Sequence, residues 1–287
     1  MYEDFFILIA EYLTTNEKIA LTATSRTMDT LKHKFRYTEK IHIRKIKELP
    51  FSHKFDFIDV ANYFPMSDGP LCEAYDANIN PKYVHTILNI TSIPIYVTHL
   101  TFDDTFNSSL GDYLSPNIIH LTFGHGFNKP IDNTTMSVTH LTFGRNFNQP
   151  INHMSDTITH LTFGDRYNQY TNILSQSITH LTFGSDFNRS HISYPPKITH
   201  LTFGYSFNKP IAGTIPDSVT HLTFGDHFNQ SLCDALPQLL THITLGAWFN
   251  RTLNGNLPDS ITTLTISKDF KKPINGRILK RVKIIYK

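Results

Sequence analysis

Ile158-Thr159-His160-Leu161-Thr162-Phe163-Gly164 is one copy of a motif that recurs through most of the chain. Its histidine returns at intervals of 20 or 21 residues. The copies of this histidine are His99, His120, His140, His160, His180, His200, His221 and His242. Self-similarity at this period is typical of a solenoid, in which the repeats stack and expose one long surface of equivalent positions.

Within each repeat, here called a rung, the apolar residues predict a short strand. They occupy the first, fourth and sixth positions of the motif, which is the core pattern of a leucine-rich repeat. Successive side chains of a strand point to opposite faces. Leu161 and Phe163 are therefore expected to face inward, and His160 and Thr162 to face outward.

The residues after each strand predict a turn and an extended return leg. Gly164 follows the strand directly, and an aromatic-asparagine pair, here Tyr167-Asn168, comes three residues later. The aromatic is expected to form a second buried layer, and the stacked asparagines to form a ladder, because asparagine satisfies backbone groups at bends. Prolines such as Pro150 in the return legs argue against an outer α-helix. The expected fold class is a mainly β, leucine-rich-repeat-like solenoid.

The return legs also carry a recognisable sequence. Phe147-Asn148-Gln149-Pro150-Ile151 closely resembles the motif for which the FNIP repeat family is named, and the stretches from Phe127 and Phe207 repeat it. The resemblance covers residues 96–275. It implies a leucine-rich-repeat-like fold that is used to bind proteins. The histidine column would then lie on the surface that faces the partner.

The first forty residues predict three short helices. The first is amphipathic, and Thr14-Thr15-Asn16-Glu17 is a capping box that opens the second. Apolar residues of the first two helices would contact a partner: Phe5, Ile9, Leu13, Ile19 and Leu21.

This helical segment resembles an F-box, with Tyr12-Leu13 ending the first helix and Thr24-Ser25-Arg26 preceding the third. The Leu-Pro that usually opens the family is absent, and Asp4-Phe5 stands in its place. The resemblance implies docking onto a Skp-type adaptor and, through it, onto a cullin ubiquitin ligase. The alternative is a helical cap that covers the core of the first rung and has no connection to ubiquitin.

We divide the whole chain into an F-box-like helical unit (1–40), an irregular linker with degenerate rungs (41–95), the FNIP repeats (96–275) and a C-terminal edge strand or cap (276–287).

The charge of the chain is unevenly distributed. Residues 98–263 hold seven Lys and Arg against eleven Asp and Glu, whereas residues 268–287 hold eight against one. A nucleic-acid-binding protein concentrates basic charge on its working surface, so the acidic repeats argue against nucleic acid.

Other function classes find no support in the sequence. No nucleophile-base arrangement or phosphate loop stands out from the repeat, so neither an enzyme nor a cofactor is expected. A linear histidine column offers an ion two neighbours at best, whereas zinc needs three or four convergent ligands, so no metal site is predicted. The N-terminus lacks a basic leader, and Phe5–Ala10 is too short to span a membrane.

Taken together, the sequence features predict a cytoplasmic substrate receptor of a cullin-type ligase, or alternatively a scaffold solenoid. The sequence does not identify the target protein.

Overall fold

The computed structural model describes residues 13–14, 17–18, 37–42, 55–59, 82–87, 98–110, 114, 116–131, 137–151, 154–171, 174–190, 192–253 and 257–287. The chain divides into two compact units, Met1–Phe102 and Asp103–Lys287. Each unit is described separately below.

The first unit contains four parallel strands in sequence order. These are β1 (Tyr37–His42), β2 (Phe55–Asp59), β3 (Lys82–Ile87) and β4 (His99–Phe102). The first three overlap the stretches of residues 41–95 in which degenerate rungs were expected. Nearer the N-terminus, Glu17 and Lys18 are helical. The Thr14 N–H donates to Glu17 Oε2 at 2.8 Å and the Glu17 N–H donates to Thr14 Oγ1 at 3.3 Å. The predicted capping box is therefore confirmed.

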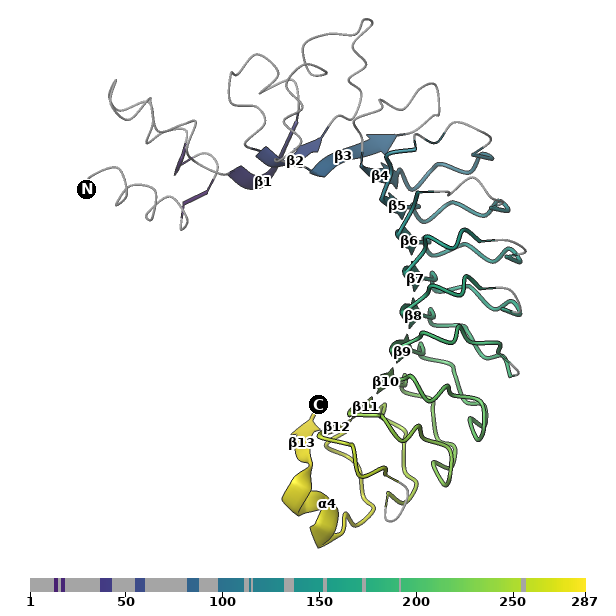
Figure 1. Cartoon of the computed structure of the whole chain (residues 1–287), viewed down its shortest axis with the longest axis vertical. Helices are drawn as coiled ribbons and strands as arrows, with labels where there is room; N and C mark the ends of the chain where they lie inside the picture. Colours follow the sequence, from purple (N-terminus) through teal and green to yellow (C-terminus); the bar gives the residue numbers. More distant parts are fainter. Residues whose placement is uncertain are drawn as a thin grey trace, which may run out of the picture. The chain divides into compact units, whose positions relative to one another are not determined.

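The second unit is a parallel β-solenoid that ends in a helix and an edge strand. Its elements are β5 (His120–Thr122), β6 (His140–Thr142), β7 (His160–Thr162), β8 (His180–Thr182), β9 (His200–Thr202), β10 (His221–Thr223), β11 (His242–Thr244), β12 (Thr263–Ile266), α4 (Gly276–Arg281) and β13 (Lys283–Tyr286). Neighbouring strands pair histidine to histidine and threonine to threonine. Figure 1 shows that these strands line the inner, concave side of the unit, and that the return legs form its outer side.

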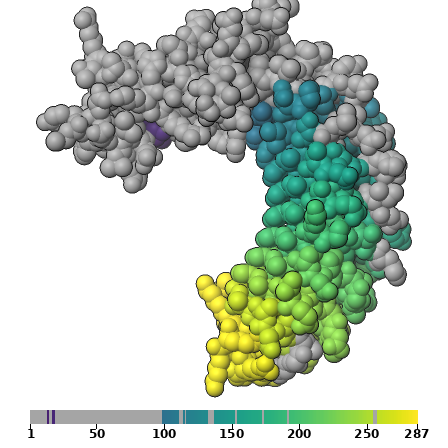
Figure 2. Space-filling view, in the orientation of Figure 1, coloured from purple at the N-terminus to yellow at the C-terminus, as the bar shows by residue number. Residues whose placement is uncertain are grey.

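Side chains alternate along each strand as the period-two pattern requires. On β7 and directly after it, Leu161 and Phe163 are buried, whereas His160 and Thr162 are half-buried. The predicted inward and outward faces are therefore confirmed. Because equivalent residues pair in register, each buried position becomes a continuous column, and the rungs pack closely against one another from teal to yellow in Figure 2.

Two columns of aromatic rings fill the core. Phe183 at the end of a strand stacks on Phe187 of the same rung with ring centroids 3.8 Å apart. Phe187 in turn lies 6.2 Å from Tyr167 and 6.3 Å from Phe207 in the neighbouring rungs. Offset stacking of this kind adds to the stabilisation from apolar burial. Each rung thus depends on both of its neighbours for its aromatic contacts.

Glycine is required where the rungs approach most closely. A Cβ atom on Gly184 would lie 2.0 Å from the carbonyl oxygen of Gly164, and the same short approach recurs at the other glycines of this column.

The turns that follow the glycines are joined by the predicted asparagine ladder, in which the side-chain oxygen of each Asn accepts the backbone N–H of the next Asn. Its members are Asn107, Asn128, Asn148, Asn168, Asn188, Asn208, Asn229 and Asn250.

One rung departs from this pattern by burying two hydroxyl groups. Tyr167 stands in the Phe column, and Thr171 stands where Ile151 and Ile211 lie in other rungs. Both side chains are buried, and neither hydroxyl has a hydrogen-bond partner among the described residues. Burial also raises the pKa of Tyr167 above its ordinary value.

The double substitution Tyr167→Phe/Thr171→Ile is therefore expected to raise the free energy of unfolding by about 1–3 kcal/mol, because it removes two unsatisfied polar groups. Urea unfolding monitored by circular dichroism measures the change. As a control, Thr162→Val changes a half-exposed position and should have a much smaller effect. Loss of stability in the double variant would show that the two hydroxyls are satisfied in solution, for example by a buried water molecule.

The C-terminal cap contains a helix that the sequence analysis did not predict. The Ile278 N–H donates to the side-chain oxygen of Asn275, which caps α4. Lys280 and Arg281 lie in its last turn, where they oppose the negative end of the helix dipole. The expected edge strand follows directly as β13, which pairs with β12 in parallel register.

Candidate functional site

The histidines of β5 to β11 form a stacked column on the concave side of the second unit. Successive rings lie face to face with centroids 4.0–4.3 Å apart and planes inclined by 9–19°. The predicted column members that stack in this way are His120, His140, His160, His180, His200, His221 and His242. His99, the remaining predicted member, lies on β4 in the first unit.

From His140 to His242, the threonine that precedes each histidine orients its ring. Thr159 Oγ1 and His160 Nδ1 are hydrogen-bonded at 2.9 Å, and Thr159 Oγ1 also donates to the backbone oxygen of Thr139 at 3.2 Å. Because a hydroxyl carries one hydrogen, both bonds together require the proton of the neutral imidazole to lie on Nδ1. The same pair of bonds recurs at His180, His200 and His221.

In the rings of His160, His180, His200 and His221, this arrangement leaves Nε2 as the hydrogen-bond acceptor. Within the described residues, the Nε2 atoms of His160, His180, His200 and His221 form no hydrogen bond, and they are not buried. They therefore face solvent. At neutral pH the concave side presents a row of equally spaced acceptors flanked by threonine side chains.

The column also sets how these rings titrate. Burial, followed by the positive charge that neighbouring rings would carry, lowers the pKa of His160, His180, His200 and His221 below the ordinary value near 6.5. Burial is the larger of the two causes.

Stability should consequently fall in mild acid. A group whose pKa is lower in the folded chain stabilises the fold fully above its unfolded pKa, and this contribution is lost as the pH falls toward the folded pKa. We expect the free energy of unfolding to decrease as the pH falls below about 6.5. Urea titrations at several pH values test this. The variant His180→Thr, which copies Thr263 of β12, should show a shallower pH dependence. A stability that rises on acidification would contradict the inference.

A second surface lies along the turns that follow the strands. We call the two residues after each glycine of the column the turn edge. Unlike the histidine column, it varies from rung to rung, and three of its aromatic residues form a cluster. The His227 ring lies 4.0 Å from the Tyr205 ring and 4.1 Å from the Trp248 ring, stacked on the latter. The sequence analysis did not identify this cluster, although the single tryptophan of the chain was a signal.

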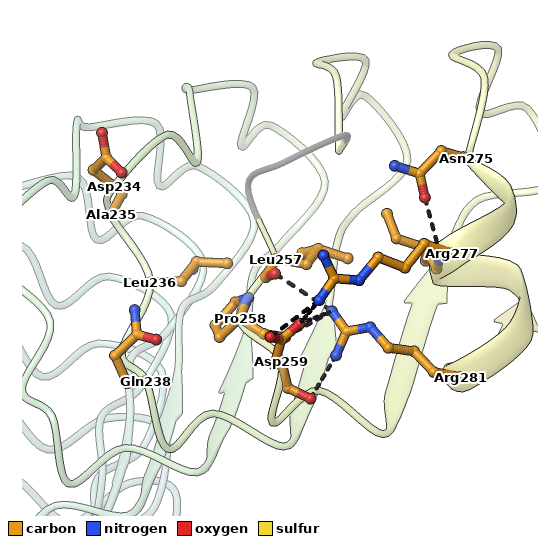
Figure 3. Close-up of a pocket in the computed structure, with 11 residues that line it drawn as sticks. Asp234, Ala235, Leu236, Gln238, Leu257, Pro258, Asp259, Asn275, Arg277 and Arg281 are labelled. Atoms are coloured by element: carbon orange, nitrogen blue, oxygen red, sulfur yellow. Dashed lines mark hydrogen bonds and ion pairs between the residues drawn. The ribbon is translucent and has the colours of Figure 1, made fainter.

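A hollow of about 350 Å³ lies near the C-terminus, between the return legs and α4. Figure 3 shows the two arginines of α4 reaching Asp259 of the preceding rung. Arg277 Nη2 donates to both carboxylate oxygens of Asp259, at 3.0 and 3.2 Å, and Arg281 donates to the backbone oxygens of Asp259 and Pro258. These arginines hold the cap to the last rungs, so we assign the hollow a structural role.

The predicted adaptor-binding residues are mostly outside the described part of the chain. Leu13 is described and half-buried, whereas Phe5, Ile9, Ile19 and Leu21 lie outside the described residues. Within the described ranges, no group of three or more histidine, cysteine, aspartate or glutamate side chains is placed to hold a metal ion. The described residues also include no helix that is long and apolar enough to cross a membrane.

Comparison with known proteins agrees with this geometry. A family model described as FNIP Repeat matches residues 133–155, 170–206 and 207–247. These rungs match the FNIP repeat. The matched FNIP residues include members of the histidine column, the asparagine ladder and both aromatic columns, so the resemblance read from the return legs is confirmed for this region. The F-box resemblance is not tested by this match and stays a prediction.

A solved structure supports the fold assignment of the FNIP region. It is described as CroV588, a novel circular LRR protein, and it is similar over 86% of this chain with 27% sequence identity and a TM-score of 0.56. The chain spans 48% of that structure, which is about half its length. A comparison with curated proteins finds no significant match. The expected leucine-rich-repeat-like solenoid is therefore confirmed.

Proposed function

We propose that this chain is a protein-binding scaffold whose contact surface is the concave side of the solenoid, formed by the histidine column, its flanking threonines and the turn edge. The observation that carries the proposal is the column itself. Its rungs bury their apolar residues inward, yet the Nε2 atoms of His160, His180, His200 and His221 stand in a row as acceptors on one continuous face. Repeat solenoids use extended concave surfaces of this kind for binding.

The proposal is tested by charge substitutions on opposite faces. The variant Thr162→Glu/Thr202→Glu places two carboxylates beside the histidine column, whereas Lys209→Glu changes a return leg on the outer side. Proteins captured by the intact chain and by each variant are compared by quantitative mass spectrometry. The concave variant should lose the specific partner and the Lys209 variant should keep it. The opposite result would place the binding surface on the return legs.

We further propose a specific role, that of substrate receptor of a cullin-type ubiquitin ligase in the cytoplasm. The N-terminal helices would dock a Skp-type adaptor through Phe5, Ile9, Leu13, Ile19 and Leu21, and the solenoid would hold the target protein. This proposal is supported by the F-box-like order of features in the sequence, and by the capping box between Thr14 and Glu17, which begins a helix where an F-box requires one. In this role the chain itself performs no chemistry.

Co-purification separates this role from the plain scaffold. The intact chain and a version that lacks residues 1–40 are each expressed with a Skp-type adaptor and a cullin. The ligase role requires that only the intact chain brings down both proteins. If neither version does so while the intact chain is folded, the helices act as a cap, and the protein is a scaffold solenoid without a ligase connection.

A further inference from the structure

The aromatic cluster of the turn edge has a geometry that packing alone does not explain. His227 lies between Tyr205 and Trp248, which belong to the rungs before and after it. Trp248 is 58% exposed and Tyr205 is 46% exposed. The Nε2 atom of His227 is buried and has no hydrogen-bond partner among the described residues. A cluster that served stability alone would bury the large rings and satisfy the ring nitrogen.

Exposed aromatic residues of this kind are typical of binding surfaces. Tryptophan and tyrosine are enriched among the residues that contribute most to protein–protein affinity. Neighbouring positions of the turn edge are small or polar, such as Ser206 and Ala247. The cluster is therefore a local aromatic patch at one border of the concave side, which is otherwise formed by threonine and histidine.

A carboxylate accompanies the cluster. Asp226 Oδ1 accepts the Ala247 N–H at 3.0 Å, and the Asp226 backbone oxygen accepts the Trp248 N–H at 3.0 Å. The carboxylate is thus fixed at the turn that carries Trp248. Within the described residues, no lysine or arginine forms an ion pair with Asp226. The turn edge from Ser185 to Trp248 carries two aspartates and no lysine or arginine, so its charge is negative.

Elsewhere the chain supplies its own cations to such groups. Two rungs upstream of the cluster, Arg145 Nε lies 3.9 Å from Asp165 Oδ2 on the same turn edge. On a return leg, the guanidinium of Arg189 lies over the Tyr170 ring, 4.9 Å from its centroid. At the cluster, an aromatic face and a carboxylate occur together, and the described chain provides no guanidinium for them.

We propose that Tyr205, His227, Trp248 and Asp226 form a pocket for an arginine side chain of the bound protein. The planar guanidinium would stack on the exposed face of Trp248 and pair with Asp226. The inference rests on the proposed function, because it names the chemistry of the partner at one border of the same binding surface. It also explains why the only tryptophan of the chain stands on the surface of an otherwise repetitive solenoid.

The experiment uses Trp248 as its own reporter, because its fluorescence cannot be confused with that of another tryptophan. Capped hexa-arginine, hexa-lysine and hexa-glutamate peptides are titrated into the full chain at one ionic strength. Hexa-arginine should change the tryptophan emission with saturation, hexa-lysine should bind more weakly because an ammonium ion does not stack, and hexa-glutamate should have no effect.

The matched variants are Asp226→Asn, which removes the charge but keeps an acceptor for the Ala247 N–H, and Tyr170→Ala, which removes an exposed aromatic far from the cluster. Asp226→Asn should weaken hexa-arginine binding about fivefold, and Tyr170→Ala should leave it unchanged. The inference is overturned by an absent response to hexa-arginine, by an equal response to hexa-lysine that Asp226→Asn does not alter, or by a response to hexa-glutamate.

This test is independent of the capture experiment on the concave side. If the Thr162→Glu/Thr202→Glu variant loses its partner while hexa-arginine leaves Trp248 unaffected, the scaffold function stands and the arginine pocket fails. If hexa-arginine binds as expected but both face variants capture the same proteins as the intact chain, the pocket stands and the proposed concave contact surface fails.

Discussion

Gly184→Ala is expected to lower the free energy of unfolding by about 4 kcal/mol or more. A loss of this size is exceptional among single substitutions and indicates a specific structural cause. The added Cβ would lie 2.0 Å from the carbonyl oxygen of Gly164 and 2.4 Å from its carbon. Both atoms belong to the backbone of the adjacent rung, so no side-chain rotation relieves the clash. The strands β7 and β8 would have to separate, which breaks their hydrogen bonds and their aromatic stacking together.

Urea unfolding measured by circular dichroism gives the size of this effect. Gly276→Ala is the matched control, because a Cβ there meets nothing within 4 Å and the residue begins α4. That control should be neutral or slightly stabilising, since alanine favours helix over glycine. Equal unfolding midpoints for the two variants would mean that the rungs are not packed at the spacing described.

Phe187→Ala should cost about 3–5 kcal/mol, as expected for a fully buried phenylalanine. Its ring is inaccessible to solvent and stacks on Phe183 of its own rung and on Tyr167 and Phe207 of the adjacent rungs. Removal of the ring leaves a cavity that interrupts one aromatic column. Because rungs stabilise their neighbours, we also expect unfolding to become less cooperative, with a reduced dependence on urea concentration.

Tyr170→Ala provides the comparison for Phe187→Ala, since it removes an aromatic ring of similar size from the same region. Tyr170 is 55% exposed, so its loss should change stability by about 0.5 kcal/mol or less. Native-state hydrogen exchange would locate the weakened region around the substituted rung. Similar losses for Tyr170→Ala and Phe187→Ala would show that the aromatic columns contribute little beyond their surface burial.

The solenoid was predictable because every rung repeats the same alternation of apolar and polar residues along its strand. Leu161 and Phe163 alternate with His160 and Thr162, and a strand that buries one pair must expose the other. The glycine after Phe163 marks the close approach, and Asn168 marks the ladder. Each of these residues contacts mainly its own copies in the adjacent rungs. The repeat period therefore suffices to predict which residues lie next to one another.

The helix α4 and the aromatic cluster could not be predicted in the same way. The helix has six residues, too few to show a helical period, and only Asn275 and the basic residues after it indicated its ends. The cluster joins Tyr205, the first residue after its glycine, to His227 and Trp248, each the second residue after its glycine. A comparison of equivalent positions does not align Tyr205 with the other two, and their contact depends on how the turn backbone orients the rings.

The histidine column lies between these two cases. Its position and exposure followed from the strand pattern, but the protonation of its rings did not. The bond from Thr159 Oγ1 to the Thr139 backbone oxygen assigns the imidazole proton to Nδ1 of His160, and this bond depends on the distance between adjacent rungs. The partner-facing role of the column stays a prediction until the face variants are measured.

The asparagine ladder gives the array a direction of growth. Each side-chain oxygen accepts the N–H of the rung that follows it in sequence, as when Asn168 accepts from Asn188. During translation, the asparagine side-chain oxygen of a folded rung is therefore available to accept a hydrogen bond from the rung that is synthesised next. During synthesis, every completed turn can act as a template for the one emerging behind it, and the protein can assemble in the order of its own translation.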